Sequence, residues 1–116
     1  MGRRQLAANR LSNTEAMVMN VIWENEHNPL PTHQLIAAFN KKFCKNYART
    51  TMVTFLARTE EKGYTTHTRI GRNVYWTPIK SKDEYIQDLF NNMVDLWLDH
   101  DITKLDTLIE SYKNRK

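Results

Sequence analysis

Apolar residues recur at helical spacing in three successive segments of the first half of the chain. The first segment follows Ser12, whose spacing to Glu15 is that of a capping box, in which each side chain satisfies a free backbone N–H of the first turn. Two prolines break the pattern in residues 27–31, and Thr32 is placed to cap a second, shorter helix. The third helix is predicted over about residues 47–62.

A two-stranded hairpin is predicted directly after these helices. Gly63 stands where a left-handed helix stop is favoured. Residues 64–69 and 74–77 are rich in β-branched and aromatic side chains, and a glycine-containing turn at residues 70–73 separates them. Pro78 ends the second strand because it cannot donate a ladder hydrogen bond. Residues 11–78 therefore read as three helices followed by a hairpin.

The last third of the chain is predicted to form two amphipathic helices. Ser81 and Glu84 repeat the S-x-x-E pattern of a helix start, and residues 100–103 interrupt the period. Each helix has a narrow apolar stripe that cannot bury itself within one helix, so we expect the stripes to pack on the front domain or on a second chain. We predict a dimer interface made of Ile86, Phe90, Met93, Val94, Trp97, Leu105, Leu108, Ile109 and Tyr112.

Composition limits the class of protein. The chain has 116 residues and a mass of 13.8 kDa, of which 41% are hydrophobic, enough for one domain with a modest core. Its single cysteine excludes an intramolecular disulfide and an all-cysteine zinc site. No apolar run approaches the roughly 20 residues of a membrane span, and residues 1–6 have no hydrophobic segment behind their charges. We expect a soluble cytoplasmic protein with no membrane partner.

Charge is distributed unevenly along the chain. Residues 1–82 hold 13 Lys and Arg against 5 Asp and Glu, a net charge of +8, whereas residues 83–116 hold 4 against 8, a net charge of −4. A basic front is suited to a polyanion such as nucleic acid, although small basic domains also occur that bind none. We expect residues 1–10, which are polar and basic, to form a flexible arm.

No enzyme chemistry is predicted. Two of the three serines already serve as helix caps, the four histidines are scattered, and three glycines cannot build a phosphate-binding loop. Cys44 has no histidine at the spacing of a nucleophile or of a metal ligand. We therefore predict no catalytic residue, no metal site and no cofactor.

The third helix has one side suited to a DNA major groove. Its core side is predicted to carry Ala48, Met52, Phe55, Leu56 and Thr59. The opposite side carries short hydroxyl side chains and one arginine, with no acid before Glu61, whereas an ordinary solvated face usually carries Glu and Lys. Threonine methyls fit thymine methyls, and arginine forms a fork onto guanine. The predicted base-reading residues are Thr50, Thr51, Thr54 and Arg58.

The order of the predicted elements also supports DNA binding by the third helix. A helix-turn-helix followed by a basic hairpin is the winged-helix arrangement, in which the third helix enters the groove and the hairpin contacts the flanking backbone. The fold class is thus mostly α with a small β-hairpin. Winged helices also serve as protein-binding modules, which is the alternative function. The predicted phosphate contacts are Lys41, Lys42, Lys45, Arg49, Arg69 and Arg72.

Three stretches resemble a known family, the penicillinase and methicillin-resistance repressors, a group that includes copper-operon repressors. They are LSNTEAMVMNVIW at residues 11–23, RTTMVTFLARTEEKG at residues 49–63 and GRNVYWTP at residues 71–78, supported by EYI at residues 84–86. The resemblance implies a homodimeric winged-helix repressor of an inverted-repeat operator. It places the DNA-binding domain at residues 11–80 and C-terminal dimerisation helices at residues 81–116.

The resemblance also concerns the signal that releases the repressor from DNA. It places groove-reading positions at Thr51, Thr54 and Arg58, which are among those chosen from the helix angle. Antibiotic-responsive members are cut by an upstream sensor protease at an Asn-Phe bond, and here Leu96-Trp97 stands at that position. Copper-responsive members carry a C-terminal cysteine cluster, and residues 83–116 contain no cysteine. The inducing signal is therefore open.

Overall fold

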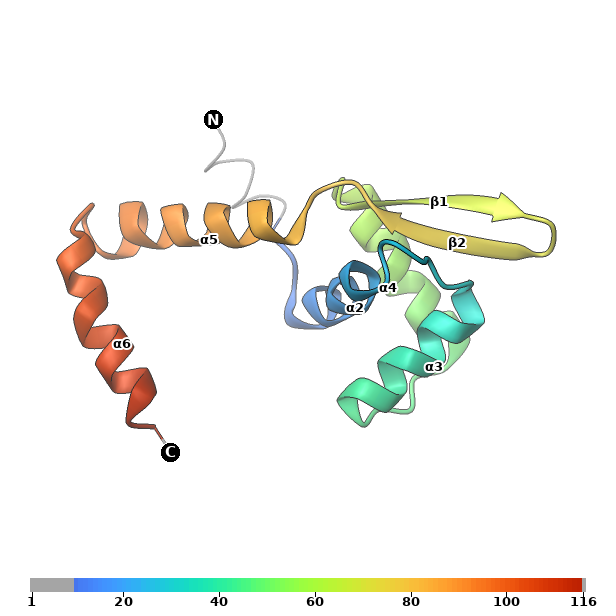
Figure 1. Ribbon diagram of the computed structural model, residues 1–116, viewed down its shortest axis with the longest axis horizontal. Helices are drawn as coiled ribbons and strands as arrows, with labels where there is room; N and C mark the ends of the chain where they lie inside the picture. The colour runs from blue at the N-terminus through green and yellow to red at the C-terminus, as the bar shows by residue number, and fades with distance from the viewer. Residues whose placement is uncertain (1–9, 116) are drawn as a thin grey trace. The chain divides into compact units, whose positions relative to one another are not determined.

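The computed structural model describes residues 10–115 and divides the chain into two compact units, with the boundary in the sequence after Lys82. The predicted arm at residues 1–10 lies outside the described residues except for Arg10. In chain order the elements are α2 (Asn13–Glu24), α3 (Thr32–Phe43), α4 (Arg49–Glu61), β1 (Thr65–Ile70), β2 (Asn73–Pro78), α5 (Lys82–Trp97), the 3₁₀ helix η1 (Ile102–Lys104) and α6 (Leu105–Lys113) (Figure 1).

The first unit is a winged helix, as the order of helices and hairpin predicts. Helix α2 contacts α3, α4 and β2, which explains why apolar residues occupy so much of its circumference. The core combines aliphatic side chains and methionines with the fully buried ring of Phe39. Its most deeply buried side chains are Val18, Met19, Val21 and Ile22 of α2, Leu35 and Phe39 of α3, and Met52 and Leu56 of α4.

A polar clamp joins the start of α2 to the end of α4. The capping box is present, because the Ser12 N–H donates to Glu15 Oε1 at 2.9 Å and the Glu15 N–H donates to Ser12 Oγ at 3.2 Å. Lys62 Nζ donates to the same Glu15 oxygen at 2.6 Å and to the Arg10 carbonyl at 2.9 Å. Burial raises the pKa of Glu15, but the hydrogen bonds and charge of Lys62 and the hydrogen bonds from Ser12 outweigh it, so the net pKa is lowered.

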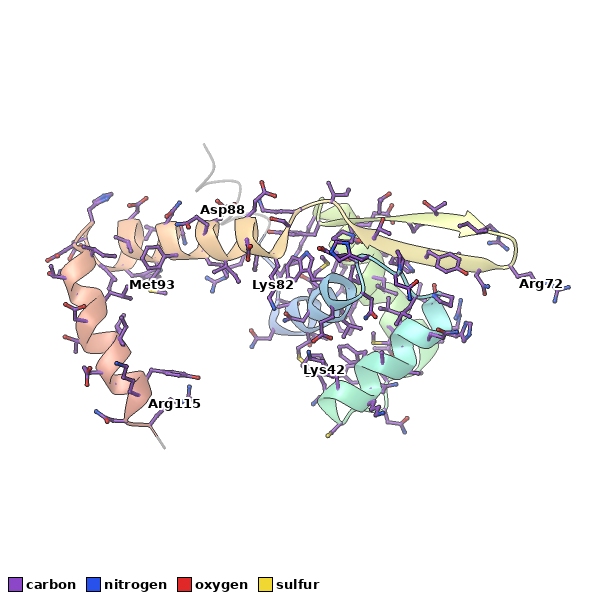
Figure 2. The ribbon with its side chains drawn as sticks, viewed as in Figure 1. Lys42, Arg72, Lys82, Asp88, Met93 and Arg115 are labelled. Carbon is purple, nitrogen blue, oxygen red and sulfur yellow. The ribbon has the colours of Figure 1, made fainter. Side chains whose placement is uncertain are left out.

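The hairpin turns tightly at Gly71 and Arg72. Ile70 pairs with Asn73, so only two residues lie between the strands. Gly71 has φ +63° and Arg72 has no positive φ, the combination found in a type II′ turn with glycine at its first central position. The turn places Arg72 at the outer end of the hairpin, where its side chain points away from the helices (Figure 2).

Thr32 joins the hairpin to α3 instead of capping the helix. The N-cap of α3 is Pro31, which offers no side-chain cap, so the expectation that Thr32 caps this helix is wrong. The Thr32 hydroxyl donates to the Val74 carbonyl at 2.8 Å and accepts from the Trp76 indole N–H at 3.1 Å. This buried contact ties β2 to the first turn of α3.

The second unit contains α5 and α6, separated by the predicted break. Asp99 and His100 both have a left-handed backbone, with φ of 52° and 62°, and Asp101 caps η1 by accepting from the Thr103 N–H at 3.0 Å. Among residues 83–115 only Tyr85, Asn92 and Leu98 are buried. Within residues 10–115, no helix has the length and apolar character needed to cross a bilayer.

Candidate nucleic-acid interface

Helix α4 has a buried side and an exposed side, as its residue pattern predicts. Met52, Leu56 and Thr59 are fully buried, and the Thr59 hydroxyl donates to the Leu56 carbonyl at 2.7 Å, so this polar group is satisfied inside the core. The expected helix start was wrong by two residues, because Ala48 is the exposed N-cap and not a core residue. All four predicted base-reading residues are exposed: Thr50, Thr51, Thr54 and Arg58.

The exposed side of α4 presents methyl groups and one guanidinium. The Thr54 hydroxyl donates to the Thr50 carbonyl at 3.0 Å, which leaves its methyl group and the oxygen lone pairs available. The Arg58 guanidinium carbon lies 5.8 Å from the centre of the Phe55 ring. Methyl groups can pack on the thymine methyl groups of a major groove, and a fork of N–H donors can bind the acceptors of guanine.

Cations lie on α3, on α4 itself and on the hairpin that follows it. Lys41 and Lys42 lie in the last turn of α3, Arg49 is the first residue of α4, and Arg69 lies in β1. Six of the seven predicted DNA-contacting cations form no ion pair within residues 10–115, namely Lys41, Lys45, Arg49, Arg58, Arg69 and Arg72. Lys42 differs from them because its ammonium group is paired with Glu24.

Most acidic side chains of the first unit are engaged by cations or histidines of the same unit. Glu15 is held by Lys62 at 2.6 Å, and Glu60 accepts from or pairs with His67 Nδ1 at 2.7 Å. The Glu24 carboxylate holds Lys42. The ammonium groups of Lys62 and Lys42 neutralise Glu15 and Glu24, so these two carboxylates add little negative potential against the six unpaired cations.

The N-terminus of α4 is open to an anion. Its N-cap Ala48 makes no side-chain hydrogen bond, and its first turn contains no acid. Arg49 is the first residue of α4, where the helix dipole disfavours a cation, so it adds nothing to the stability of the helix. Free N–H groups at such a terminus, together with an arginine, suit a phosphate oxygen.

His67 connects the hairpin to α4, a role that sequence reasoning missed. Its ring contacts Glu60 near the end of α4 and lies 5.0 Å from the ring of Trp76, its cross-strand partner. Because the contact spans two elements, no local spacing in the sequence could have revealed it.

The second unit exposes large apolar side chains. None of the nine predicted interface residues is buried in the single chain; Phe90, Val94 and Leu105 are half-buried and the other six are exposed. Trp97 at the end of α5 is 75% exposed, and Met93 lies on the same helix (Figure 2). Leu96 and Ile102 are also exposed but lie outside the predicted stripes. An apolar surface of this extent on so small a unit is typical of an interface.

Among residues 10–115, no group of three or more His, Cys, Asp or Glu side chains is arranged to hold a metal ion. Cys44, the C-cap of α3, is exposed and has a left-handed backbone with φ 54°.

Comparison with known proteins connects these features to a family. The profile of the family described as Penicillinase repressor matches residues 11–111. The chain is 29% identical over 125 residues to the penicillinase repressor of Bacillus licheniformis, a match that covers 92% of this chain and 94% of that protein. It is also similar to the solution structure of the DNA-binding domain of the repressor BlaI, with a TM-score of 0.56 and 29% identity over 66% of this chain and 88% of that one.

Proposed function

Because the chain belongs to the penicillinase repressor family, and is therefore a DNA-binding repressor and not an enzyme, we propose that it acts as a homodimer on an inverted-repeat operator. In this proposal α4 enters the major groove and the hairpin contacts the flanking backbone. The base-reading residues are Thr50, Thr51, Thr54 and Arg58. The phosphate contacts are Lys41, Lys42, Lys45, Arg49, Arg69 and Arg72.

One observation carries the proposal. The exposed side of α4 has no acid before Glu61, and the predicted DNA-contacting cations other than Lys42 form no ion pair within the described part of the chain. A helix that binds a protein groove would instead present an apolar stripe. Because unpaired cations raise affinity for any duplex through release of condensed counterions, this surface favours DNA over a protein partner.

Exposed apolar side chains on α5 and α6 support the homodimer. An amphipathic helix of nine residues such as α6 is marginal in water unless its apolar side is covered. A second copy of the same helices offers a complementary apolar surface and generates two-fold symmetry. That symmetry calls for an operator with half-sites whose centres lie about 10 base pairs, or a multiple, apart.

We propose residues 1–10 as a basic arm, residues 11–80 as the DNA-binding domain and residues 81–116 as the dimerisation region, in a cytoplasmic protein. Release from DNA then requires only that the dimer separates, because joining two binding modules raises avidity by about 10²–10⁴-fold. An upstream sensor protease is one route to separation. The segment His100-Asp101-Ile102, where η1 begins and where His100 and Ile102 are exposed, is a better site for such a cut than Leu96-Trp97, which lacks the asparagine.

The experiment is a titration of a fluorescent random-sequence duplex at salt concentrations between about 50 and 200 mM. We expect affinity to fall steeply with salt for the full chain, and the slope of log K against log salt to fall by about one unit per protomer in Arg72→Ala. Lys104→Ala, which removes one exposed cation of the second unit, is the matched control and should keep the wild-type slope. Salt-independent binding, or equal slopes for the two variants, contradicts the proposed phosphate contacts.

A further inference from the structure

We infer that Phe55 is a positioning residue for Arg58, and that it sets how well the protein distinguishes its operator from other DNA. This inference rests on the proposed base-reading role of Arg58. It goes beyond that role, because Phe55 itself need not touch the DNA. The juxtaposition that points to it is a series of aromatic rings running from the buried core to the exposed guanidinium.

The first contact in the series is between Phe55 and Arg58. The two residues are three positions apart on α4, so their side chains are neighbours on the helix surface, at the border between its buried and exposed sides. The guanidinium carbon of Arg58 lies 5.8 Å from the centre of the Phe55 ring, within the range of a cation–π interaction. Arg58 has no ion pair within residues 10–115, so no carboxylate of this region competes for its orientation.

The Phe55 ring is in turn held from the core side. The ring of Tyr47 lies 6.4 Å from that of Phe55 and is stacked at 5.6 Å on Phe39, which is completely buried. Phe55 is only half-buried, so part of its ring is open to contact with Arg58. A ring fixed in this way offers the guanidinium a rigid surface.

Asn40 fixes Tyr47 by its backbone. The Asn40 side-chain amide accepts from the Tyr47 N–H at 3.0 Å and donates to the Tyr47 carbonyl at 3.2 Å. These two bonds clamp the loop between α3 and α4, the turn of the helix-turn-helix. The loop, the aromatic series and Arg58 therefore form one connected structure.

Orientation matters because guanine is read by a bidentate fork. Two parallel N–H donors must meet O6 and N7 together, and a freely rotating side chain loses entropy when it is fixed there. A guanidinium already held on a ring loses less, which is the general benefit of preorganisation. Phosphate contacts accept many orientations, so loss of the ring should reduce specificity more than overall affinity.

The test uses the full chain and two readouts. The first is the NMR chemical shift of the Arg58 side-chain protons in the free protein, which a ring directly beneath them moves upfield. The second is the ratio of Kd for a random-sequence duplex to Kd for a duplex selected from a random pool by the wild-type protein. Because both Kd values come from one preparation, the ratio cancels any common loss of folded protein.

Five variants are compared with the wild type, one of which is Arg58→Ala alone, the reference for the double variant. Phe55→Leu keeps an apolar side chain but removes the ring, and Phe55→Tyr restores a ring. Phe43→Leu is the matched control, because Phe43 packs on the same core residue, Phe39, at 5.1 Å but belongs to α3. The double variant of Phe55→Leu with Arg58→Ala shows whether Phe55 acts through Arg58.

We expect Phe55→Leu to abolish the upfield shift and to lower the specificity ratio by about 2- to 5-fold, the effect of an exposed cation–π contact. Phe55→Tyr and Phe43→Leu should keep both values, and Phe55→Leu should have no effect on the ratio when Arg58 is already alanine. An equal loss in the Arg58→Ala background would overturn the inference, since Phe55 would then contact a base directly. An unchanged shift and ratio in Phe55→Leu would overturn it as well.

Failure of the proposed function looks different. If the wild-type protein selects no sequence from the pool, base reading by Arg58 is refuted, and the inferred effect of Phe55 on specificity falls with it. The upfield shift of Arg58 would still report whether its guanidinium lies on the Phe55 ring. The two failures are therefore distinguishable.

Discussion

Replacing Glu15 by glutamine tests whether the polar clamp between α2 and α4 stabilises the DNA-binding unit. The Glu15 side chain is only 4% exposed, and Lys62 is 28% exposed. A hydrogen bond to a charged group contributes about 1.5–3 kcal/mol to stability. Glutamine keeps one acceptor oxygen but loses the charge, so we expect Glu15→Gln to lower the free energy of unfolding by about 1–2 kcal/mol.

The assay is urea unfolding followed by tryptophan fluorescence, near pH 7 and at about pH 3, at one protein concentration because dimerisation adds to stability. The lowered pKa of Glu15 means that the folded state favours the carboxylate. Its contribution is complete above the ordinary value of 4.5 and is lost as pH falls through the lower folded value. The difference between wild type and Glu15→Gln should therefore shrink at the acidic pH.

Glu61→Gln is the matched control. Glu61 is exposed at the end of α4, next to Lys62, and is not part of the clamp. Its replacement should change stability by no more than about 0.5 kcal/mol. A Glu15→Gln variant as stable as this control near neutral pH, or a deficit of equal size at both pH values, would refute the reasoning.

Three further predictions concern DNA and the switch. Arg58→Ala should cost about 1–3 kcal/mol on a selected duplex and relax preference at one base pair in a competition assay, and an equal loss on random DNA would contradict its base-reading role. Trp97→Ala should weaken the dimer in sedimentation by about 3–5 kcal/mol if the exposed ring becomes fully buried there, and an unchanged dimer would remove Trp97 from the interface. Stoichiometric copper should not release the protein from DNA. Mass spectrometry of protein from induced cells should show no cut between Leu96 and Trp97. Release by copper, or a cut at this bond, would show that this chain keeps one of the release mechanisms known in the family.

Local signals predicted much of the winged helix from the sequence. The capping box at Ser12 and the helix stop at Gly63, whose φ is +87°, depend on residues within a few positions, and both were confirmed. The separation of α4 into a buried and an exposed side follows from the helical period alone. These features are predictable because their physical cause lies within one turn of the chain.

Contacts between distant residues account for what the sequence could not predict. Thr32 resembles a helix cap, but Val74 and Trp76, more than forty positions away, take its hydroxyl group. The start of α4 was misplaced because Asn40 holds Tyr47 in the preceding loop. The partner of Lys42, Glu24, is likewise remote in sequence, so Lys42 was not distinguishable from its unpaired neighbours.

The polar clamp and the apolar surface of the second unit were also only partly predictable from the sequence. Glu15 was predicted as one half of a capping box, but its contact with Lys62 crosses 47 positions. In the second unit, the helical period predicted the apolar stripes. It did not predict that Leu96 and Ile102 are exposed apolar residues, because the regular helix ends near them. Sequence periodicity predicts which side chains share one face of a regular helix, but it does not predict which side chains are exposed beyond the end of the helix.

Selection of bound duplexes from a random-sequence pool by the full chain tests the central claim most directly. A homodimer that reads DNA through α4 should enrich one inverted repeat whose half-site centres lie about 10 base pairs, or a multiple, apart. Sequencing the retained pool gives both the half-site and the spacing. A pool without any enriched motif would contradict sequence-specific repression, and enrichment of a single unrepeated site would contradict the two-fold dimer.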